Sequence, residues 1–255
     1  MAAFPLMLPG TSRPPKLVVF DLDHTLIACD ATILWTEFLY EKKIVTDPIW
    51  RQYDRDMVKS YAKGVLDIRD FCRKHAGAFR SIPEEKLHAL AQEFAKKKIA
   101  PLIFPDGKKW VKNALQANIP ACVLSASAAF IVQPIAKLFG LTDAMGIELA
   151  FKDGFCTGEI VGIPTFQEGK VERLSQRLAE ADIGFEDVLF FTDSRNDLPL
   201  AERAGYTVCV NPDAVLESAA RKNGWKVAEW KLSLRTQMTA QVDAKGVPET
   251  QTVRS

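Results

Sequence analysis

Two aspartates, Asp21 and Asp23, follow directly after a short β-rich run at residues 16–20. Because they stand two positions apart just past a strand, their carboxylates can face different directions. One carboxylate can attack a phosphorus atom, while the other, close to the leaving oxygen, supplies a proton and later removes one. The structural alternative is a turn at the strand end that an aspartate merely caps.

Further reactive side chains follow two later apolar runs. Ser125 and Ser127 come after the second run, Asp193 comes after the third, and Lys170 opens a helical segment between them. Because ligands of open α/β sheets bind beyond the carboxyl ends of the strands, we expect these groups to meet at one edge of a sheet. Carboxylates from two strand ends suit Mg²⁺, whereas a hydroxyl and an ammonium group suit phosphate oxygens.

The order of the predicted elements supports this arrangement. Strands that alternate with helices predict an α/β fold with a doubly wound parallel sheet. Residues 147–162 alternate in polarity and contain three glycines, which suggests a small antiparallel hairpin or flap. The expected strands cover residues 16–20, 120–124, 187–192 and 206–210, and the expected helices cover residues 106–117, 128–138, 168–180, 196–203 and 213–223.

Residues 30–100 have a different pattern of residue types and contain no convincing strand. Charged and aromatic residues recur there at helical spacing, which predicts an insertion of about four helices. One of these helices is expected to start near Pro83, with Ser81 as its cap. The predicted division is an irregular lead-in at residues 1–15, a core at 16–29 and 101–225, a helical cap at 30–100 and a mobile tail at 231–255.

The composition excludes several classes of protein. Of the 255 residues, 47% are hydrophobic and 25% are charged, which is typical of a globular chain and excludes general disorder. The 33 basic and 32 acidic residues nearly cancel, so we expect neither nucleic acid nor an anionic membrane as partner. The five cysteines form no CxxC pair, which indicates free thiols in a reducing compartment such as the cytoplasm. No apolar run reaches the roughly 18–20 residues of a membrane span, so no stable membrane association is expected.

Four segments together resemble the motifs of the haloacid dehalogenase (HAD) superfamily of phosphotransferases. They are FDLDHTL at 20–26, VLSAS at 123–127, Lys170 within 168–171 and FTDSRND at 191–197. The resemblance covers residues 16 to about 225 and implies a Rossmann-like core. Because the helical insertion lies between the first two motifs, the chain resembles subfamily IB, with its phosphoserine- and histidinol-phosphatase-like members.

The resemblance implies roles for the aspartates of the motifs. Asp21 would be the nucleophile that forms an aspartyl-phosphate, and Asp23 would act as general acid and then as general base. The carboxylates of Asp21 and Asp193 and the backbone carbonyl of Asp23 would ligate Mg²⁺. Asp197 would hold a water of the metal ion or orient Lys170.

Phosphate binding is implied for the remaining motif residues. Ser125 and Lys170 would bind phosphoryl oxygens, and the backbone N–H groups of Leu22 and Ala126 would help. Together with Mg²⁺, these donors would offset the negative charge that gathers on the phosphoryl group during transfer.

Recognition of the substrate is expected from the cap. Residues 64–75 resemble the segment in which phosphoserine phosphatases carry an arginine for the substrate carboxylate, and a gapless comparison places His75 there. An imidazole binds a carboxylate less well than a bidentate guanidinium does, so phosphoserine becomes a less favoured substrate. Arg69, Arg73 and Arg80 are the alternative partners for a carboxylate.

Two residues beside the first motif have open alternatives. Asp30 falls where subfamily IB places a carboxylate that faces the substrate, often near an amino group, but it also fits the N-cap of a helix. His24 is either a neutral spectator or a contact to the substrate or leaving group.

The sequence therefore predicts a Mg²⁺-dependent phosphomonoesterase for a small phosphorylated metabolite that resembles phosphoserine or histidinol phosphate. One alternative is a phosphatase or phosphotransferase for another class, such as a lipid head group or a nucleotide. A non-catalytic binding protein on the same scaffold is a further alternative, but the intact aspartates and Lys170 argue against it. The sequence determines neither the physiological substrate nor the oligomeric state.

Overall fold

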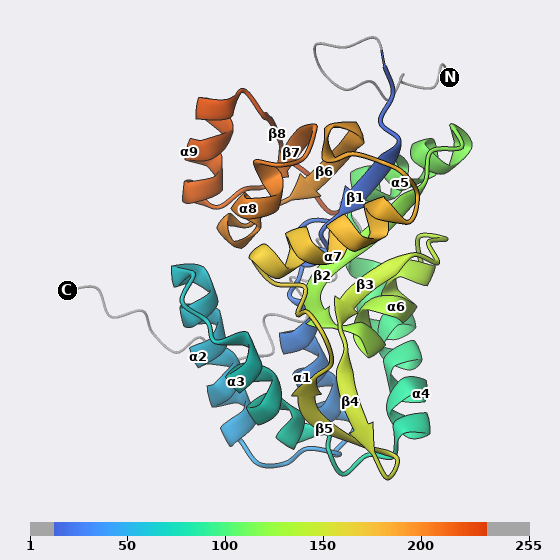
Figure 1. Cartoon of the computed structure of the whole chain (residues 1–255). Helices are drawn as coiled ribbons and strands as arrows, with labels where there is room; N and C mark the ends of the chain where they lie inside the picture. The colour runs from blue at the N-terminus through green and yellow to red at the C-terminus, as the bar shows by residue number, and fades with distance from the viewer. Residues whose placement is uncertain (1–12, 234–255) are drawn as a thin grey trace, which may run out of the picture.

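A computed structural model describes residues 13–233, which form a six-stranded sheet covered by helices (Figure 1). All neighbouring strands are parallel and follow the order β3-β2-β1-β6-β7-β8, which confirms the predicted doubly wound α/β fold. The predictions for residues 1–12 and 234–255 lie outside the described residues. The strands are β1 (Leu17–Phe20), β2 (Ala121–Ala128), β3 (Ala144–Ile147), β6 (Val188–Thr192), β7 (Tyr206–Val210) and β8 (Lys226–Ala228).

Strand β1 lies inside the sheet because every one of its side chains is apolar and fully buried. Leu17 and Val19 pack with α7 and α8 on one face, whereas Val18 and Phe20 pack with α5 and α6 on the other. A strand covered on both faces needs a continuous apolar run, and such a run is visible in the sequence. The helices of the core are α5 (Pro105–Gln116), α6 (Ala129–Lys137), α7 (Glu168–Ala179), α8 (Leu198–Ala201) and α9 (Ala214–Asn223).

The two edge strands, β3 and β8, differ from the sequence prediction. Strand β3 has a single β-branched residue, Ile147, and includes a glycine, while β8 is largely exposed, so neither carries the β-rich signal that marks a buried strand. Strand β8 also extends the sheet beyond residue 225, where the sequence predicts the core to end. After it, Trp230 is buried against Phe104 and Phe191.

Four α-helices lie between β1 and the core helix α5 in the described chain, as predicted, and they cover the carboxyl ends of the strands (Figure 1). A π-helical turn at Ala95–Ile99 and a 3-10 turn at Ala100–Leu102 lead back to the core. We call residues 30–100 the cap, and these bounds stay a prediction. The helices are α1 (Ala31–Glu41), α2 (Ile49–Lys63), α3 (Ile68–His75) and α4 (Glu84–Phe94).

The N-terminus of α1 has the capping residue that the sequence offers, whereas the predicted capping residue of α4 is corrected by the structure. Asp30 is the N-cap of α1 and accepts a hydrogen bond from the backbone N–H of Ile33 at 3.0 Å. The predicted cap at Ser81 is wrong, because Pro83 holds the N-cap of α4 and no side chain caps that helix. Proline can take this position because its φ is fixed and the first N–H groups of a helix have no intrahelical partner.

The alternating segment forms the predicted hairpin, with strands β4 (Leu149–Lys152) and β5 (Phe155–Ile160). The hairpin packs on α3, and Gly158 allows the close approach. A Cβ atom at Gly158 would lie 2.7 Å from the Ala76 Cβ and 3.0 Å from the Arg73 Cα. The hairpin therefore belongs spatially with the cap, although it comes from the core part of the sequence (Figure 1).

An aromatic cluster joins the cap to the core. Trp35 of α1 is fully buried and packs edge-on against Phe94 of α4 and Phe130 of α6, with ring centroids 5.4 and 5.6 Å apart. Because Phe130 belongs to the core, this contact holds the cap over the strand ends. Within residues 13–233, no helix combines the length and the apolar character that a membrane crossing requires.

Substitution of Gly169 tests how tightly the segment before Lys170 packs. A Cβ atom at Gly169 would come within 1.9 Å of the Pro164 carbonyl oxygen, so Gly169→Ala forces the backbone to move. We expect a loss of roughly 1–3 kcal/mol, seen as a melting temperature several degrees lower. Glu168→Ala, at an exposed position in the same turn, is the control and should change the melting temperature little. Equal melting temperatures for the two variants would contradict this packing.

Candidate active site

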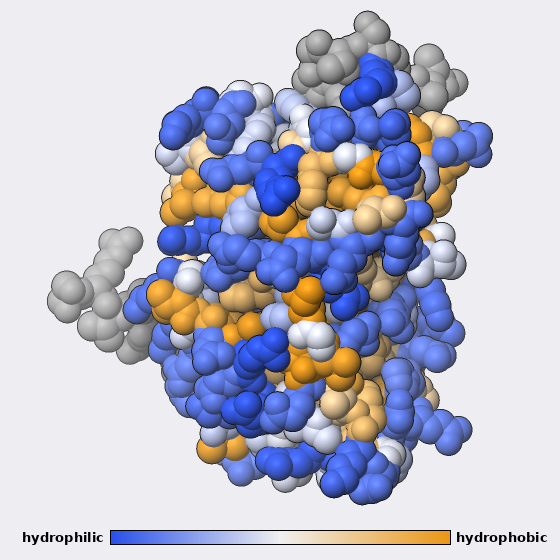
Figure 2. Space-filling model, in the orientation of Figure 1, coloured by the Kyte–Doolittle hydropathy of each residue, from blue (hydrophilic) through white to orange (hydrophobic). Residues whose placement is uncertain are grey.

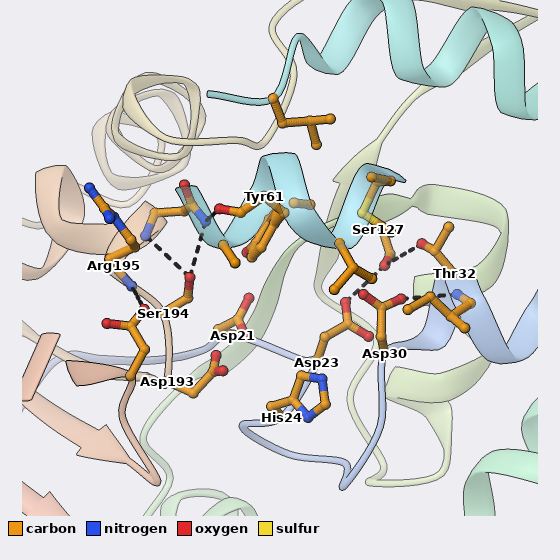
Figure 3. A pocket seen from close by; sticks show the side chains of 18 of the residues that line it. Asp21, Asp23, His24, Asp30, Thr32, Tyr61, Ser127, Asp193, Ser194 and Arg195 are labelled. Carbon is orange, nitrogen blue, oxygen red and sulfur yellow. Dashed lines mark hydrogen bonds between the residues drawn. The ribbon is translucent and has the colours of Figure 1, made fainter. Parts of the chain in front are cut away.

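A cavity of about 440 Å³ lies between the carboxyl ends of β1, β2 and β6 and the cap (Figure 3). This volume is typical of sites that bind small molecules. The core side is polar and includes Asp21, Asp23, Ser127 and Asp193, whereas the cap side is mostly apolar. The apolar residues of the cap that line it are Ile33, Met57, Val58, Ala62, Leu66, Ile68 and Phe71.

Lys170, in the first turn of α7, is a buried cation at the edge of this cavity, with 1% of its surface exposed. Its Nζ donates to Asp21 Oδ1 at 2.7 Å and to Asp197 Oδ2 at 2.8 Å. Burial lowers the pKa of Lys170, but the carboxylates of Asp197 and Asp21 outweigh burial and raise the pKa overall. The lysine therefore stays charged and links the strand end of β1 to the loop after β6.

Asp23 is held by hydrogen bonds on both carboxylate oxygens. The backbone N–H of Ala31 donates to Oδ1 at 2.7 Å, while the hydroxyls of Ser127 and Ser125 donate to Oδ2 at 2.8 and 3.3 Å. Burial raises the pKa of Asp23 to about 6, and the charge of Asp30 adds to this effect. A carboxyl group with a pKa near neutrality can both give and take a proton under ordinary conditions.

Asp21 and Asp193 extend from the paired strands β1 and β6. Burial raises the pKa of Asp21 to about 7, because the charge of Lys170 offsets burial only in part and nearby carboxylates add to it. Burial likewise raises the pKa of Asp193 well above its usual value, with Asp21 as the next contributor. The charge of Lys170 therefore does not balance the carboxyl groups that the site gathers.

This donor set fits a divalent cation. Among residues 13–233, no group of three or more His, Cys, Asp or Glu side chains is arranged to hold a metal ion alone. Asp21 and Asp193 nevertheless form a pair of hard oxygen donors whose pKa values a cation would lower. Such a pair fits Mg²⁺, which is usually held by one or two carboxylates together with other oxygen ligands.

The groups predicted to bind phosphate lie at the same edge. Ser125 is fully buried beneath Asp23, and Ala126 lines the cavity. The backbone N–H of Leu22 has no acceptor among the described residues, which leaves it open to a ligand oxygen. Ser127 was assigned no separate role from sequence, but it lines the cavity beside Ala126.

His75 lies away from the cavity, contrary to the sequence prediction. It is 5% exposed inside the cap, where it hydrogen-bonds with Thr36 at 3.0 Å and stacks on Phe71 with ring centroids 5.1 Å apart. Burial lowers the pKa of His75 to about 4, so the ring is neutral near pH 7. His75 therefore does not line the cavity, because α3 turns this side chain toward α1 and not toward the carboxylates of the site.

The three arginines that were alternatives to His75 also lie outside the cavity lining. Arg73 Nε donates to Glu159 Oε1 at 2.9 Å on the surface of the hairpin, and Arg69 Nη2 donates to the carbonyl of Gly162, just after the hairpin, at 3.3 Å. Arg80 is exposed and contributes nothing to the lining. Arg73 therefore does not line the cavity in which it was expected to recognise the substrate, because its guanidinium pairs with the hairpin.

Asp30 caps α1, which confirms one of its two alternatives, and it also lines the cavity, while its contact with a substrate stays a prediction (Figure 3). His24 lines the cavity too, with a left-handed backbone at φ 56°. Sequence reasoning missed six polar residues of the lining. Ser194, Arg195 and Asn196 stand within the fourth motif, which is a usable signal, whereas nothing local marks the others. The missed residues are Thr32, Tyr61, Ser194, Arg195, Asn196 and Asp213.

Comparison with known proteins yields a family and close relatives. The model of the haloacid dehalogenase-like hydrolases matches residues 18–202. A histidinol-phosphatase of Neisseria meningitidis is 35% identical over 220 residues, which are 85% of this chain and 99% of the relative. Phosphoserine phosphatase SerB1 of Mycobacterium tuberculosis is 26% identical and is matched over 90% of this chain and 77% of its own length. A crystal structure of a Bordetella pertussis protein of unknown function has 32% identity and a TM-score of 0.75, over 83% of this chain and 96% of that one.

The raised pKa of Asp21 predicts how the stability of the metal-free protein varies with pH. Because this carboxyl holds its proton up to about pH 7 in the folded state, the folded chain binds more protons than the unfolded chain, and stability falls as the pH rises toward and through 7. Asp21→Asn cannot ionise, so it should raise the melting temperature in EDTA at pH 8 but not at pH 5. Asp106→Asn, at an exposed position, is the control. A lower melting temperature for Asp21→Asn at pH 8 would contradict this electrostatic description.

Proposed function

The chain belongs to the haloacid dehalogenase-like hydrolases and is a phosphatase, and we propose that it hydrolyses the phosphate ester of a small amino alcohol of the histidinol phosphate type. The proposed reaction passes through an aspartyl-phosphate on Asp21 and depends on Mg²⁺. One observation carries the proposal. The cavity has catalytic carboxylates on its core side and, on its cap side, an apolar wall with Asp30 as its charged residue.

The proposed reaction has two displacements at phosphorus. First, the Asp21 carboxylate attacks, the bond between phosphorus and the ester oxygen breaks, and Asp23 gives its proton to the leaving alcohol. Then water attacks phosphorus, Asp23 takes a proton from it, and the bond to Asp21 breaks with release of inorganic phosphate. The pKa of Asp23, about 6, suits both proton transfers. Lys170, at 2.7 Å from Asp21, offsets the negative charge of the phosphoryl group.

Asp21, Asp193 and the backbone carbonyl of Asp23 are the groups that would hold Mg²⁺. The ion would supply positive charge beside the transferring phosphoryl group. Asp197 accepts hydrogen bonds from Lys170 at 2.8 Å and from the Thr192 hydroxyl at 2.7 Å. Its proposed part is therefore to orient Lys170.

The nature of the leaving group follows from the charges around the cavity. Among the described cap residues, Asp30 lines the cavity with a carboxylate, and no lysine or arginine does so. A substrate amine would pair with Asp30, and an aromatic or apolar body would lie against residues such as Met57 and Phe71, whereas a carboxylate would meet no cation of the cap. Histidinol phosphate combines an amine with an imidazole ring, and the N. meningitidis relative carries the name histidinol-phosphatase.

A phosphoserine-like ester is a second candidate, which Arg195 favours. This residue lines the cavity from the core side, and its guanidinium has no hydrogen bond or ion pair with any residue from 13 to 233. It lies against Gly64, where an added Cβ atom would be 3.4 Å from its Nε. A carboxylate on the leaving group would find its partner there.

Phosphate release from a panel of esters tests the reaction. We expect kcat/KM to be higher for histidinol phosphate than for phosphoserine, nucleotides, sugar phosphates or lipid head-group phosphates. EDTA should abolish turnover and Mg²⁺ should restore it. Asp21→Asn should lower kcat by about 10³-fold or more with an unchanged circular dichroism spectrum, because the nucleophile is lost.

Each other outcome of the panel has a distinct meaning. Turnover by Asp21→Asn at the rate of the unchanged chain contradicts the nucleophile, and full activity in EDTA contradicts the metal requirement. Turnover of lipid head-group phosphates or nucleotides alone assigns another substrate class. No release from any ester would favour the non-catalytic alternative.

Two substitutions separate the two candidate leaving groups. Asp30→Asn keeps a side chain that can cap α1 but removes the charge, so KM for histidinol phosphate should rise roughly tenfold while 4-nitrophenyl phosphate is unaffected. Arg195→Met should leave KM for histidinol phosphate unchanged. The opposite pattern, in which Arg195→Met alone weakens the preferred ester, would assign a carboxylate-bearing substrate.

A further inference from the structure

Tyr61, in the last turn of α2, brings a hydroxyl group from the cap to the catalytic side of the cavity (Figure 3). It lines the cavity together with Asp21 and Asp193, and it lies close to Ser194 of the fourth motif. The other side chains that α2 places on the cavity are apolar. They are Met57, Val58 and Ala62.

The hydrogen of the Tyr61 hydroxyl is available to a ligand. Ser194 Oγ already accepts from the backbone N–H of Asn196 at 3.2 Å and from its Nδ2 at 3.3 Å, so its own hydrogen is free to point at Tyr61. Burial raises the pKa of Tyr61 well above its usual value, and the charges of Asp197 and other carboxylates add to this effect. The phenol therefore keeps its proton and can donate it in a hydrogen bond.

Two side-chain amides of the core hold this turn of α2 in place. Asn196 Nδ2 donates to the Tyr61 carbonyl at 3.0 Å, and Gln167 Nε2 donates to the Gly64 carbonyl at 3.3 Å. Gln167 Nε2 also donates to Asn196 Oδ1 at 3.1 Å, which joins the two amides. The Tyr61 ring packs on Phe166, with ring centroids 5.8 Å apart. The position of the phenol over the site is thus set by the segment that precedes α7.

Gln167 adopts a backbone conformation that is rare for a residue other than glycine, with φ 49° and ψ −124°. Such conformations persist where surrounding contacts fix them, and they cluster at functional sites. In this conformation the Gln167 side-chain amide reaches the cap, while the Gln167 backbone begins α7, whose first turn carries Lys170.

We propose that Tyr61 is a catalytic residue contributed by the cap, whose hydroxyl donates a hydrogen bond to a phosphoryl oxygen during transfer, and that Gln167 and Asn196 position it. This proposal rests on the proposed function, because it needs a phosphoryl group above Asp21. The phenol lines the cavity with the residues that react, and a donor there gains most when an anionic phosphoryl group is present. The contact is therefore to the group that all substrates share and not to the leaving alcohol.

Kinetics of Tyr61→Phe on two esters test this assignment. We expect kcat/KM to fall roughly ten- to hundredfold for both the preferred ester and 4-nitrophenyl phosphate, because one donor to the phosphoryl group is lost. Inhibition by inorganic phosphate should weaken as well. Tyr53→Phe lies on the same helix but off the cavity, and it should match the unchanged chain. Melting temperatures establish that each variant is folded.

The outcomes separate this proposal from the proposed function. A loss confined to the preferred ester would place Tyr61 at the leaving group, and unchanged kinetics on both esters would remove it from catalysis; either result overturns the proposal. If the unchanged chain hydrolyses neither ester, the proposed function itself fails.

The positioning role of Gln167 has its own test. Gln167→Met removes both amide hydrogen bonds, so it should lower kcat more than it raises KM. In a Tyr61→Phe background the same substitution should cause little further loss, because the group that it positions is already absent. Losses that multiply in the double variant would show that Gln167 acts independently of Tyr61 and would overturn its positioning role.

Discussion

The ammonium group of Lys170 lies between the carboxylates of Asp21 and Asp197, and the rest of the site depends on this buried contact. One lysine cannot neutralise all the acids that the fold gathers here, and burial therefore raises the pKa values of several of them. In the proposed function, a divalent cation would remove this repulsion and would supply the positive charge that a phosphoryl group requires. The further carboxylates that line the cavity include Asp23, Asp30 and Asp193.

The cap supplies what the carboxylates need from their surroundings. Its wall on the cavity is mostly apolar, and in the proposed function it would keep water from the bound ester, where electrostatic interactions are stronger. The buried contact of Trp35 with Phe130 keeps this wall over the strand ends. In the function proposed here, the core performs phosphoryl transfer while the cap selects the leaving group through Asp30. With the role proposed for Tyr61, the cap also takes part in the transfer of the phosphoryl group.

The core of the site could be predicted from the sequence because each of its motifs is marked by a feature of local structure. Asp21 and Asp193 end fully buried strands, and such strands appear as continuous apolar runs. The cap is different, because helical periodicity locates a helix but not the face that it turns toward the site. The gapless comparison with phosphoserine phosphatases likewise places His75 at the substrate, although its ring packs on Phe71 inside the cap, and no local signal marks Tyr61.

The central claim is that Asp21 carries the phosphoryl group between the two displacements. Its most direct test is to mix the protein and Mg²⁺ with an ester labelled in its phosphoryl group, to quench the reaction in acid within one turnover and to map the label by mass spectrometry. The account predicts an acyl phosphate on the peptide that contains Asp21, and no label on Asp21→Asn. A label on another residue, or phosphate released in one turnover with no labelled protein at any quench time, would contradict it.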